Sequence, residues 1–299
     1  MPQSLRDSSP AISVVVRTLG SARLGDALES LAVQTRRDFE VVVVDLSGGR
    51  IEGLLDRFAS RLPSLRRVTP TGHRTRPAAL NAGVRAARAP LLAVLDDDNL
   101  YDPNHLEILV GGLEASGADY VYTGVRHATY EPSGRLVERR DVSLPWSFDR
   151  VILGNFVYAT GSAYRRSLWE AVSGYDERFV VFEDWDFIIR AAQRGRIEHL
   201  RVVSGESRKF TGLPAVSHFD REIDAARRCL AGVYWTHRHL YRGRLRDELK
   251  AASAEHCRRR FQARTGLLAK TVGGFRLELG LDLAGWWTVN PAGRPRVAA

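Results

Sequence analysis

Two clusters of carboxylate side chains carry the clearest chemical signal in this 299-residue sequence. The first is the run Asp96-Asp97-Asp98, directly after the apolar segment LLAVL. Neighbouring carboxylates raise one another's pKa, and a divalent cation relieves their repulsion. Mg2+ and Mn2+ take carboxylate and phosphate oxygens as ligands. Because residues 96 and 98 of an extended segment point the same way, we expect Asp96 and Asp98 to share a metal ion that Asp97 does not reach directly. The alternative is a solvated acidic turn that caps the helix expected near Pro103.

The second cluster is Phe182-Glu183-Asp184-Trp185-Asp186, at the predicted start of a helix. A helix start stabilises the charged form of a carboxylate in its first turn, which suits a general base that must be ionised at neutral pH. Ordinary helix-terminal charge is the alternative explanation of this cluster by itself. The combination of a metal-type acidic turn with an acidic helix start about 85 residues later favours an active site.

The first 125 residues alternate apolar segments with helical patterns, which indicates a doubly wound, mostly parallel sheet covered by helices. Helix Ala78–Arg88 has Pro77 at its first position, where the missing N–H is tolerated. The expected strands are Ile12–Val16, Val41–Val44, Leu65–Val68, Leu91–Leu95 and Tyr120–Val125, and the other expected helices are Leu24–Gln34 and Ile51–Arg61.

After residue 125 the alternation of strands and helices changes. We expect a hairpin around Pro132-Ser133-Gly134, a strand at Val157–Tyr164 and a helix at Trp185–Arg194 that ends at Gly195. Further helices are expected at Ala225–His239 and Arg244–Arg264. No signal-peptide pattern and no apolar stretch of membrane-spanning length is found, so a cytoplasmic protein is expected.

Ligands of an open parallel sheet bind outside the carboxyl ends of its strands. These ends are Arg17-Thr18, Asp45-Leu46-Ser47 and the acidic run that begins at Asp96. No GxGxxG follows the first strand and no GxxxxGK[ST] occurs, which argues against a dehydrogenase or a P-loop NTPase.

The net charge of +9 is uneven. Residues 1–219 carry 28 basic and 27 acidic side chains, whereas residues 220–299 carry 16 and 8. The first segment is therefore nearly neutral, which argues against nucleic acid as the main ligand. Two cysteines are too few for a disulfide scaffold or a cysteine-rich zinc module.

The segments VVVRT, VVVVDLS, RPAALNAG, VLDDDN, GSAYRRSLWEAVSGYDE and FEDWDF occur in an order that resembles the family 2 glycosyltransferases. The resemblance extends from about residue 11 to residue 200. It implies a GT-A fold: an α/β domain with a mostly parallel central sheet flanked by helices. We expect this catalytic domain at residues 1–219 and a basic, mainly helical C-terminal extension at residues 220–299.

The resemblance also implies roles for individual residues. Asp184 is the expected catalytic base, with Glu183 and Trp185 on the acceptor side. His218 in AVSHFD is the candidate third metal ligand, although a structural histidine is the alternative. The nucleotide-sugar would contact Thr18, Asp45, Arg76, Asp96 and Asp97, and Mn2+ or Mg2+ would bind Asp96 and Asp98.

Three positions depart from the family's usual sequence. Arg17 and Gly20 stand where a proline and an asparagine are common, and Leu46 stands where a second aspartate is common. These departures concern the nucleotide pocket, so the identity of the base and of the sugar stays open.

The implied reaction is a metal-dependent, inverting transfer of a sugar from a UDP-, GDP- or dTDP-linked donor to an acceptor hydroxyl. The acceptor classes left open are a polysaccharide, a lipid-linked carrier and a small molecule. For the basic extension we expect contact with an anionic acceptor, with the inner face of the membrane, or with another subunit in a homo-oligomer. The alternatives are an inactive glycosyltransferase-like protein, a protein that binds nucleic acid or another partner through the extension, and a sugar-nucleotide pyrophosphorylase. The last is disfavoured because RTLGSARLG is poor in glycine and lysine.

Overall fold

The computed structural model describes residues 9–72, 74–211 and 223–240. These residues form two compact units. The first comprises the described residues up to 151 and from 155 to 230, and the second comprises 152–154 and 231–240. His218, the expected domain boundary at 219/220 and the expected helix Arg244–Arg264 lie outside the described residues.

A nine-stranded sheet forms the centre of the first unit, with the strand order β3-β2-β1-β4-β8-β6-β9-β5 and with β7 paired to β6. The neighbours β3, β2, β1 and β4 are parallel, β8 is antiparallel to both β4 and β6, and β6 is parallel to β9. The strands are β1 (Ile12–Thr18), β2 (Phe39–Asp45), β3 (Leu65–Val68), β4 (Leu91–Asp96), β5 (Leu100–Tyr101), β6 (Tyr120–Tyr130), β7 (Leu136–Val142), β8 (Ser162–Arg165) and β9 (Ile197–Phe210).

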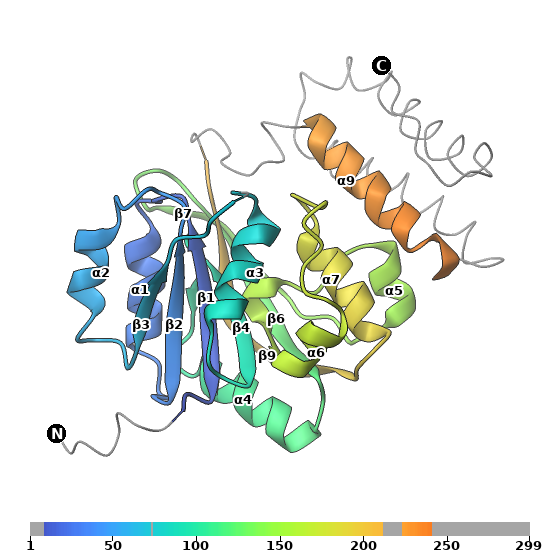
Figure 1. Ribbon diagram of the computed structural model, residues 1–299, viewed down its shortest axis with the longest axis horizontal. Helices are drawn as coiled ribbons and strands as arrows, with labels where there is room; N and C mark the ends of the chain where they lie inside the picture. Colours follow the sequence, from blue (N-terminus) through green and yellow to red (C-terminus); the bar gives the residue numbers. More distant parts are fainter. Residues whose placement is uncertain (1–8, 73, 212–222, 241–299) are drawn as a thin grey trace. The chain divides into compact units, whose positions relative to one another are not determined.

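Helices cover both faces of this sheet (Figure 1). The α-helices are α1 (Leu24–Ala32), α2 (Glu52–Phe58), α3 (Arg76–Ala86), α4 (His105–Ser116), α5 (Phe148–Leu153), α6 (Arg166–Ala171), α7 (Glu183–Ala192) and α9 (Ile223–Thr236), and two short 3-10 helices are η2 (Ala159–Gly161) and η3 (Arg238–Leu240).

Alternation along the buried strands explains the two layers. In β1, Val14 and Val16 belong to the apolar core shared with α1, α2 and α4. Val15 points to the other face, where α3 packs so closely that a Cβ on Gly83 would lie 2.4 Å from Val15 Cγ1. Since side chains alternate across a strand, an apolar segment such as that of β1 must be covered on both faces.

The predicted strands at Ile12, Val41, Leu65, Leu91 and Tyr120 are all present, as are the three predicted helices between them and the β6–β7 hairpin. The predicted strand Val157–Tyr164 is wrong over its first part, because residues 159–161 form η2 and strand β8 begins at Ser162. Strand β9 was not predicted. Its alternating side chains are charged or polar over Glu206–Lys209, so the sequence lacks the apolar periodicity that marks a strand.

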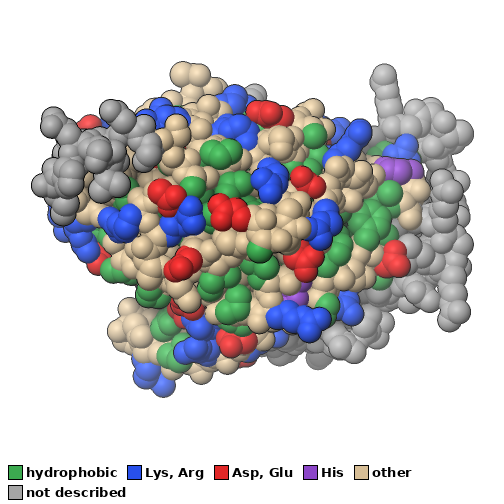
Figure 2. All heavy atoms as spheres, turned by 90° about the horizontal axis from the view of Figure 1, so that it is seen from below, with side chains coloured by type: hydrophobic (Ala, Val, Ile, Leu, Met, Phe, Trp, Pro, Cys, Tyr) green, Lys and Arg blue, Asp and Glu red, His purple; other side chains and the backbone are tan. Residues whose placement is uncertain are grey.

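In the second unit the Tyr234 hydroxyl donates to the Leu153 carbonyl oxygen at 3.0 Å. Across both units, none of the described helices is long and apolar enough to cross a membrane. On the described part of the face shown in Figure 2, basic and acidic side chains are interspersed. This mixture agrees with the near-neutral composition of residues 1–219.

Candidate active site

The candidate site lies at the carboxyl ends of three neighbouring parallel strands. Strand β1 has β2 on one side and β4 on the other, so the chain adds β2 and β3 on one side of β1 and then crosses to add β4 on the other side. In register, Thr18 lies beside Asp45 of β2, and Arg17 lies beside Asp96 of β4. Such a reversal opens the crevice in which α/β sheets bind ligands.

The turn after β4 is tied to the end of β1 by two side-chain contacts. Arg17 Nη2 donates to Asp96 Oδ1 at 2.7 Å, and Thr18 Oγ1 donates to Asp97 Oδ2 at 2.5 Å. The Thr18 oxygen in turn accepts the backbone N–H of Gly20 at 2.9 Å. Asp96 and Asp97 therefore face β1 and are already partnered.

Asp98 differs from its two neighbours. Its carboxylate has no hydrogen bond or ion pair within the described residues, although its backbone carbonyl accepts Arg208 Nε at 2.6 Å. Burial and the charges of Asp96 and Asp97 together raise the pKa of Asp98 to about 6, although Arg17 and Arg208 oppose the rise. The pKa of Asp96 is lowered instead, because the cations Arg17 and Arg76 outweigh its burial.

The donor set of this turn suits a hard divalent cation. Oxygen ligands are those that Mg2+ prefers, and Mg2+ commonly takes only one or two protein carboxylates together with substrate phosphates. The uncompensated carboxylate of Asp98 fits this use. Among the described residues no group of three or more His, Cys, Asp or Glu side chains is arranged to hold a metal ion.

Arg76 joins the acidic turn to the second acidic cluster. It is the first residue of α3, whose start is capped by the Thr75 hydroxyl, which accepts the backbone N–H of Ala78 at 3.4 Å. Its Nε lies 2.9 Å from Glu183 Oε1, and its Nη2 lies 3.7 Å from Asp96 Oδ2. One guanidinium therefore bridges a strand end and a helix start that are far apart in the sequence.

Asp184 is in the first turn of α7, and the residue before Glu183, Phe182, has a left-handed backbone with φ 66°. Such a conformation is uncommon for a bulky residue and is often found at functional sites. Asp184 Oδ1 accepts the N–H of Trp185 at 2.8 Å, and Oδ2 accepts Asn155 Nδ2 at 3.1 Å.

Burial and, to a smaller extent, the adjacent Glu183 charge together raise the pKa of Asp184 to about 7, although Arg76 opposes the rise. The expectation that the helix start would hold this carboxylate ionised is therefore wrong in direction. Loss of water around a partly buried carboxylate outweighs the favourable field of the first helical turn. A carboxyl group with a pKa near the working pH is well suited to accept and release a proton.

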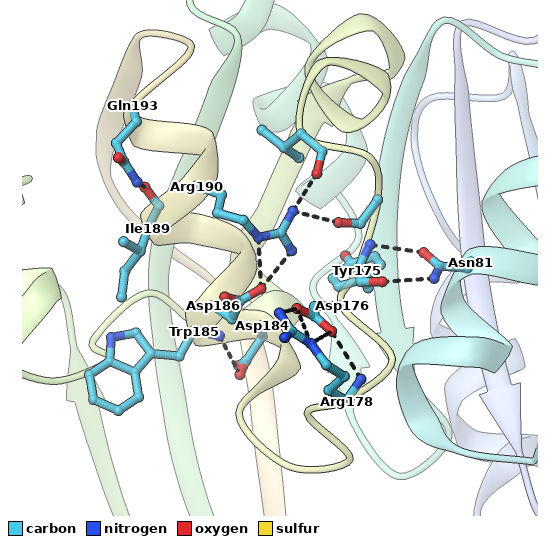
Figure 3. A network of polar contacts seen from close by, with 12 residues as sticks. Asn81, Tyr175, Asp176, Arg178, Asp184, Trp185, Asp186, Ile189, Arg190 and Gln193 are labelled. Atoms are coloured by element: carbon cyan, nitrogen blue, oxygen red, sulfur yellow. Dashed lines mark hydrogen bonds and ion pairs between the residues drawn. The ribbon is translucent and has the colours of Figure 1, made fainter. Parts of the chain in front are cut away.

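A separate set of contacts fixes the start of α7 against its surroundings (Figure 3). Arg190 donates from Nε to Asp186 Oδ2 at 2.8 Å and from Nη1 to the Gly174 carbonyl at 2.8 Å. Asn81 of α3 donates to the Tyr175 carbonyl and accepts the Tyr175 N–H, each at 2.9 Å. The loop before α7 is thus held from both sides, by α3 and by α7 itself.

Three sequence-predicted site residues are buried: Glu183 and Trp185 do not face an acceptor, whereas Asp45 lies at the expected strand end beside Thr18. Glu183 is 4% exposed and faces Arg76 rather than an acceptor. Trp185 is 2% exposed, and its indole N–H donates to the Val151 carbonyl at 2.6 Å. Its side chain therefore packs in the interior beside the start of α7 and does not face an acceptor. Asp45 is 1% exposed and accepts Ser47 and Gly49 from its own loop.

Asn155 and Arg208 are not predicted from the sequence as site residues, and Arg17 is predicted at the ligand-binding edge but without its contact to Asp96. Asn155 contacts Asp184, Arg17 contacts Asp96, and Arg208 contacts the turn at Asp98. Only Arg17 had a sequence signal, because it follows an apolar strand. Arg208 belongs to the unpredicted strand β9, and Asn155 lies in a segment without periodicity.

The family model described as "Glycosyl transferase family 2" matches residues 13–171. A PGL/p-HBAD biosynthesis glycosyltransferase of Mycobacterium tuberculosis (strain ATCC 25618 / H37Rv) is 30% identical over 219 residues, which cover 69% of this chain and 80% of that protein. An uncharacterized glycosyltransferase of Bacillus subtilis (strain 168) is 26% identical over 200 residues, covering 64% of this chain and 72% of the relative.

Solved structures show the same fold at low sequence identity. The crystal structure of S. aureus TarS residues 1–349 in complex with UDP-GlcNAc has a TM-score of 0.58 and 19% identity, covering 91% of this chain and 81% of that one. Mannosyltransferase PcManGT from Pyrobaculum calidifontis, in complex with GDP-Man and Mn2+, has a TM-score of 0.57 and 20% identity, covering 95% and 84%. A longer TarS chain is matched over 49% of its length. The expected GT-A fold is confirmed.

Proposed function

The chain belongs to glycosyl transferase family 2, and we propose that it transfers a sugar from a nucleotide-diphosphate sugar to an acceptor hydroxyl with inversion at the anomeric carbon. The observation that carries the proposal is the position of Arg76. Its guanidinium contacts Asp96 of the acidic turn and Glu183, the neighbour of Asp184. In a transferase the groups that bind the donor must lie next to the group that deprotonates the acceptor, and Arg76 joins the two acidic clusters in this way.

On the donor side we assign the strand-end residues Thr18, Asp45, Asp96 and Asp97 together with Arg76. The diphosphate gains negative charge as it leaves the sugar, and a fixed cation stabilises that charge in the transition state. Arg76 is the residue suited to this role, because its guanidinium is permanently charged and held at a helix start.

On the acceptor side we assign Asp184 as the general base. Its carboxylate removes the proton from the acceptor hydroxyl as that oxygen attacks the anomeric carbon. Asn155 and the Trp185 N–H fix the orientation of the carboxylate. A pKa of about 7 makes Asp184 a stronger base than an ordinary aspartate while leaving a large ionised fraction at neutral pH.

Asp98 and Asp96 would hold Mn2+ or Mg2+ in this reaction. When bound, such an ion supplies Lewis-acid stabilisation of the leaving diphosphate. The Mn2+ complex of PcManGT, which shares the fold, supports a divalent ion here. His218 is kept as a candidate ligand that lies outside the described residues.

The donor is a UDP-, GDP- or dTDP-linked sugar, and the UDP-GlcNAc and GDP-Man complexes of the two structural neighbours support this class. The acceptor is a polysaccharide, a lipid-linked molecule or a small molecule. We keep the basic segment 220–299 as the part that contacts the acceptor, the inner membrane face or another subunit.

The test is a panel of nucleotide-sugars assayed for thermal stabilisation of the protein with Mn2+ and with EDTA. A ligand that binds the native state raises its stability, so one nucleotide class should raise the melting temperature, and more strongly with Mn2+. The stabilising donor is then assayed with acceptors from each class, and the anomeric configuration of the product is read by NMR. Absence of stabilisation by every nucleotide-sugar contradicts the proposal.

A further inference from the structure

A small cavity is lined in part by Asp184. Its volume is about 10 Å3, which is close to the minimum space that one water molecule needs. Its lining residues are Val94, Tyr120, Ala159, Ser162, Tyr164, Tyr175, Asp184 and Phe187. The lining surface is mostly apolar, but it includes one carboxylate residue and four residues that carry hydroxyl groups. These can supply the two to four polar partners that one bound water needs.

Two of these hydroxyls are paired with each other. The hydroxyl oxygens of Tyr164 and Tyr175 lie 2.9 Å apart, and both side chains are buried, with exposed fractions of 2% and 5%. Each tyrosine hydroxyl has one hydrogen to donate. One hydrogen forms the bond between them, and the other has no hydrogen-bond acceptor among the described protein groups.

A buried hydroxyl hydrogen without an acceptor is costly, and native structures usually supply a partner or an ordered water. Ser162 cannot serve as a further donor, because its hydroxyl donates to the Tyr158 carbonyl at 2.7 Å. Asp184 has acceptor capacity left, since an ionised carboxylate offers about four acceptor sites and two are used.

We propose that the Tyr164–Tyr175 hydroxyl pair positions Asp184 through one ordered water molecule in this cavity. The water accepts the remaining tyrosine hydrogen and donates to the carboxylate, so that it stabilises the ionised form of the base. Tyr164 and Tyr175 are then positioning residues for the reaction under "Proposed function", on which the inference rests.

The tyrosine pair is itself rigidly held. Tyr175 is fixed through its backbone by Asn81, and its ring stacks on Phe187 of α7 with centroids 4.5 Å apart (Figure 3 shows the Asn81 contacts). Tyr164 is in strand β8 and packs on the same Phe187 ring at 5.0 Å. Rigid supports keep the two hydroxyls at the cavity, as a positioning role requires.

The other groups that act on Asp184 come from several elements. Those that are charged or titratable are Glu183 of α7, Arg76 of α3, Asp96 of β4 and Tyr120 of β6. The variants Tyr164→Phe and Tyr175→Phe leave all of them in place, so a change in the titration of Asp184 reports on the hydroxyl pair.

The experiment measures the titration of Asp184 directly. Full-length protein with 13C-labelled aspartate carboxyl groups is titrated by NMR, and the Asp184 signal is assigned by its absence in Asp184→Asn. In Tyr164→Phe and in Tyr175→Phe we expect the pKa of Asp184 to rise by about half a pH unit or more, because the hydroxyl pair that orders the water is broken and the water donates less well to the charged form. The acidic limb of the kcat/KM profile should move to higher pH by the same amount.

Tyr122→Phe is the matched control. Tyr122 is as buried as Tyr164, but its hydroxyl donates to the Leu144 carbonyl at 2.7 Å and does not line the cavity. The proposal is overturned if the Asp184 pKa in both cavity variants equals that of Tyr122→Phe, or if it falls. Because the NMR titration needs no substrate, it stands even if no sugar transfer is found, which would instead contradict the proposed function.

Discussion

Replacing Asp184 by asparagine should abolish the base and, at alkaline pH, stabilise the fold. The pKa of Asp184 moves from 3.8 to about 7 on folding, which corresponds to about 4 kcal/mol at 1.36 kcal/mol per pH unit. Because the side chain is only partly buried, solvent reduces this to about 2–3 kcal/mol. An acid with a raised pKa binds its proton more tightly in the native state, so the wild type loses this stability as the pH rises from about 4 to about 7.

The assay is urea unfolding of the wild type and of Asp184→Asn at pH 4.5 and at pH 8.5. Asparagine does not ionise, so only the wild type loses this stability at the higher pH. The free energy of unfolding of the variant minus that of the wild type should therefore be about 2–3 kcal/mol larger at pH 8.5 than at pH 4.5. Any pH-independent cost of the amide cancels in this comparison. Turnover of the substrate pair should fall by about 10²–10⁴-fold, the usual contribution of a general base.

Asp176→Asn is the control. Burial opposes ionisation of Asp176, but hydrogen bonds from Arg178 outweigh it and lower its pKa. Its stabilising effect is lost only at pH values below about 4, so this variant should be destabilised by a similar amount at pH 4.5 and pH 8.5. If the difference in free energy of unfolding between Asp184→Asn and the wild type is also the same at pH 4.5 and pH 8.5, then burial does not raise the pKa of Asp184 and the prediction is refuted.

Four further substitutions have expected results. Ser173 is exposed and has a left-handed backbone with φ 59°, which costs free energy for a residue with a Cβ, so Ser173→Gly should raise the free energy of unfolding by about 1 kcal/mol. Gly174→Ala should lower the free energy of unfolding in the same urea assay, since a Cβ there would lie 2.8 Å from Asn81 Oδ1. Asn81→Ala should cost about 2–3 kcal/mol by leaving the backbone N–H and carbonyl of Tyr175 unpaired; an unchanged unfolding midpoint would show that this link is not needed. Asp98→Asn should weaken Mn2+ binding at least about tenfold by calorimetry, and in the wild type binding should tighten as the pH rises through about 6; equal affinities would remove Asp98 from the metal site.

The sequence predicts the strand-end part of the candidate site well, because local signals specify it. Apolar segments mark β1, β2 and β4, and the polar residues that follow them must meet at one edge of a parallel sheet. The strand pattern alone therefore puts Thr18 and Asp96 at this edge, and the register places them on adjoining strands. The start of α7 near Asp184 is also predicted within two residues.

The rest of the candidate site depends on contacts that no local pattern reveals. Arg208 reaches the acidic turn from a strand with few apolar residues, and Tyr164 meets Tyr175 only because β8 and the loop before α7 pack together. The ionisation of Asp184 was predicted in the wrong direction for a related reason. Its helix position is visible in the sequence, but its burial and its closeness to other carboxylates are properties of the fold.

The pairing of β4 with β8 has a consequence for biosynthesis of the chain. The acidic turn ends at residue 98, whereas Asp184 emerges 86 residues later, about 4–17 s at usual rates of translation. In the finished sheet one edge of β4 pairs with β8, with Leu91 opposite Arg165. Until β8 is made, that edge of β4 has no partner strand. An apolar strand edge is a template for association with other chains. A nascent chain in this interval therefore has the carboxylates proposed to contact a metal and a donor, but not the proposed base Asp184. Rapid synthesis through residue 165 would shorten the time in which this edge of β4 is unpaired.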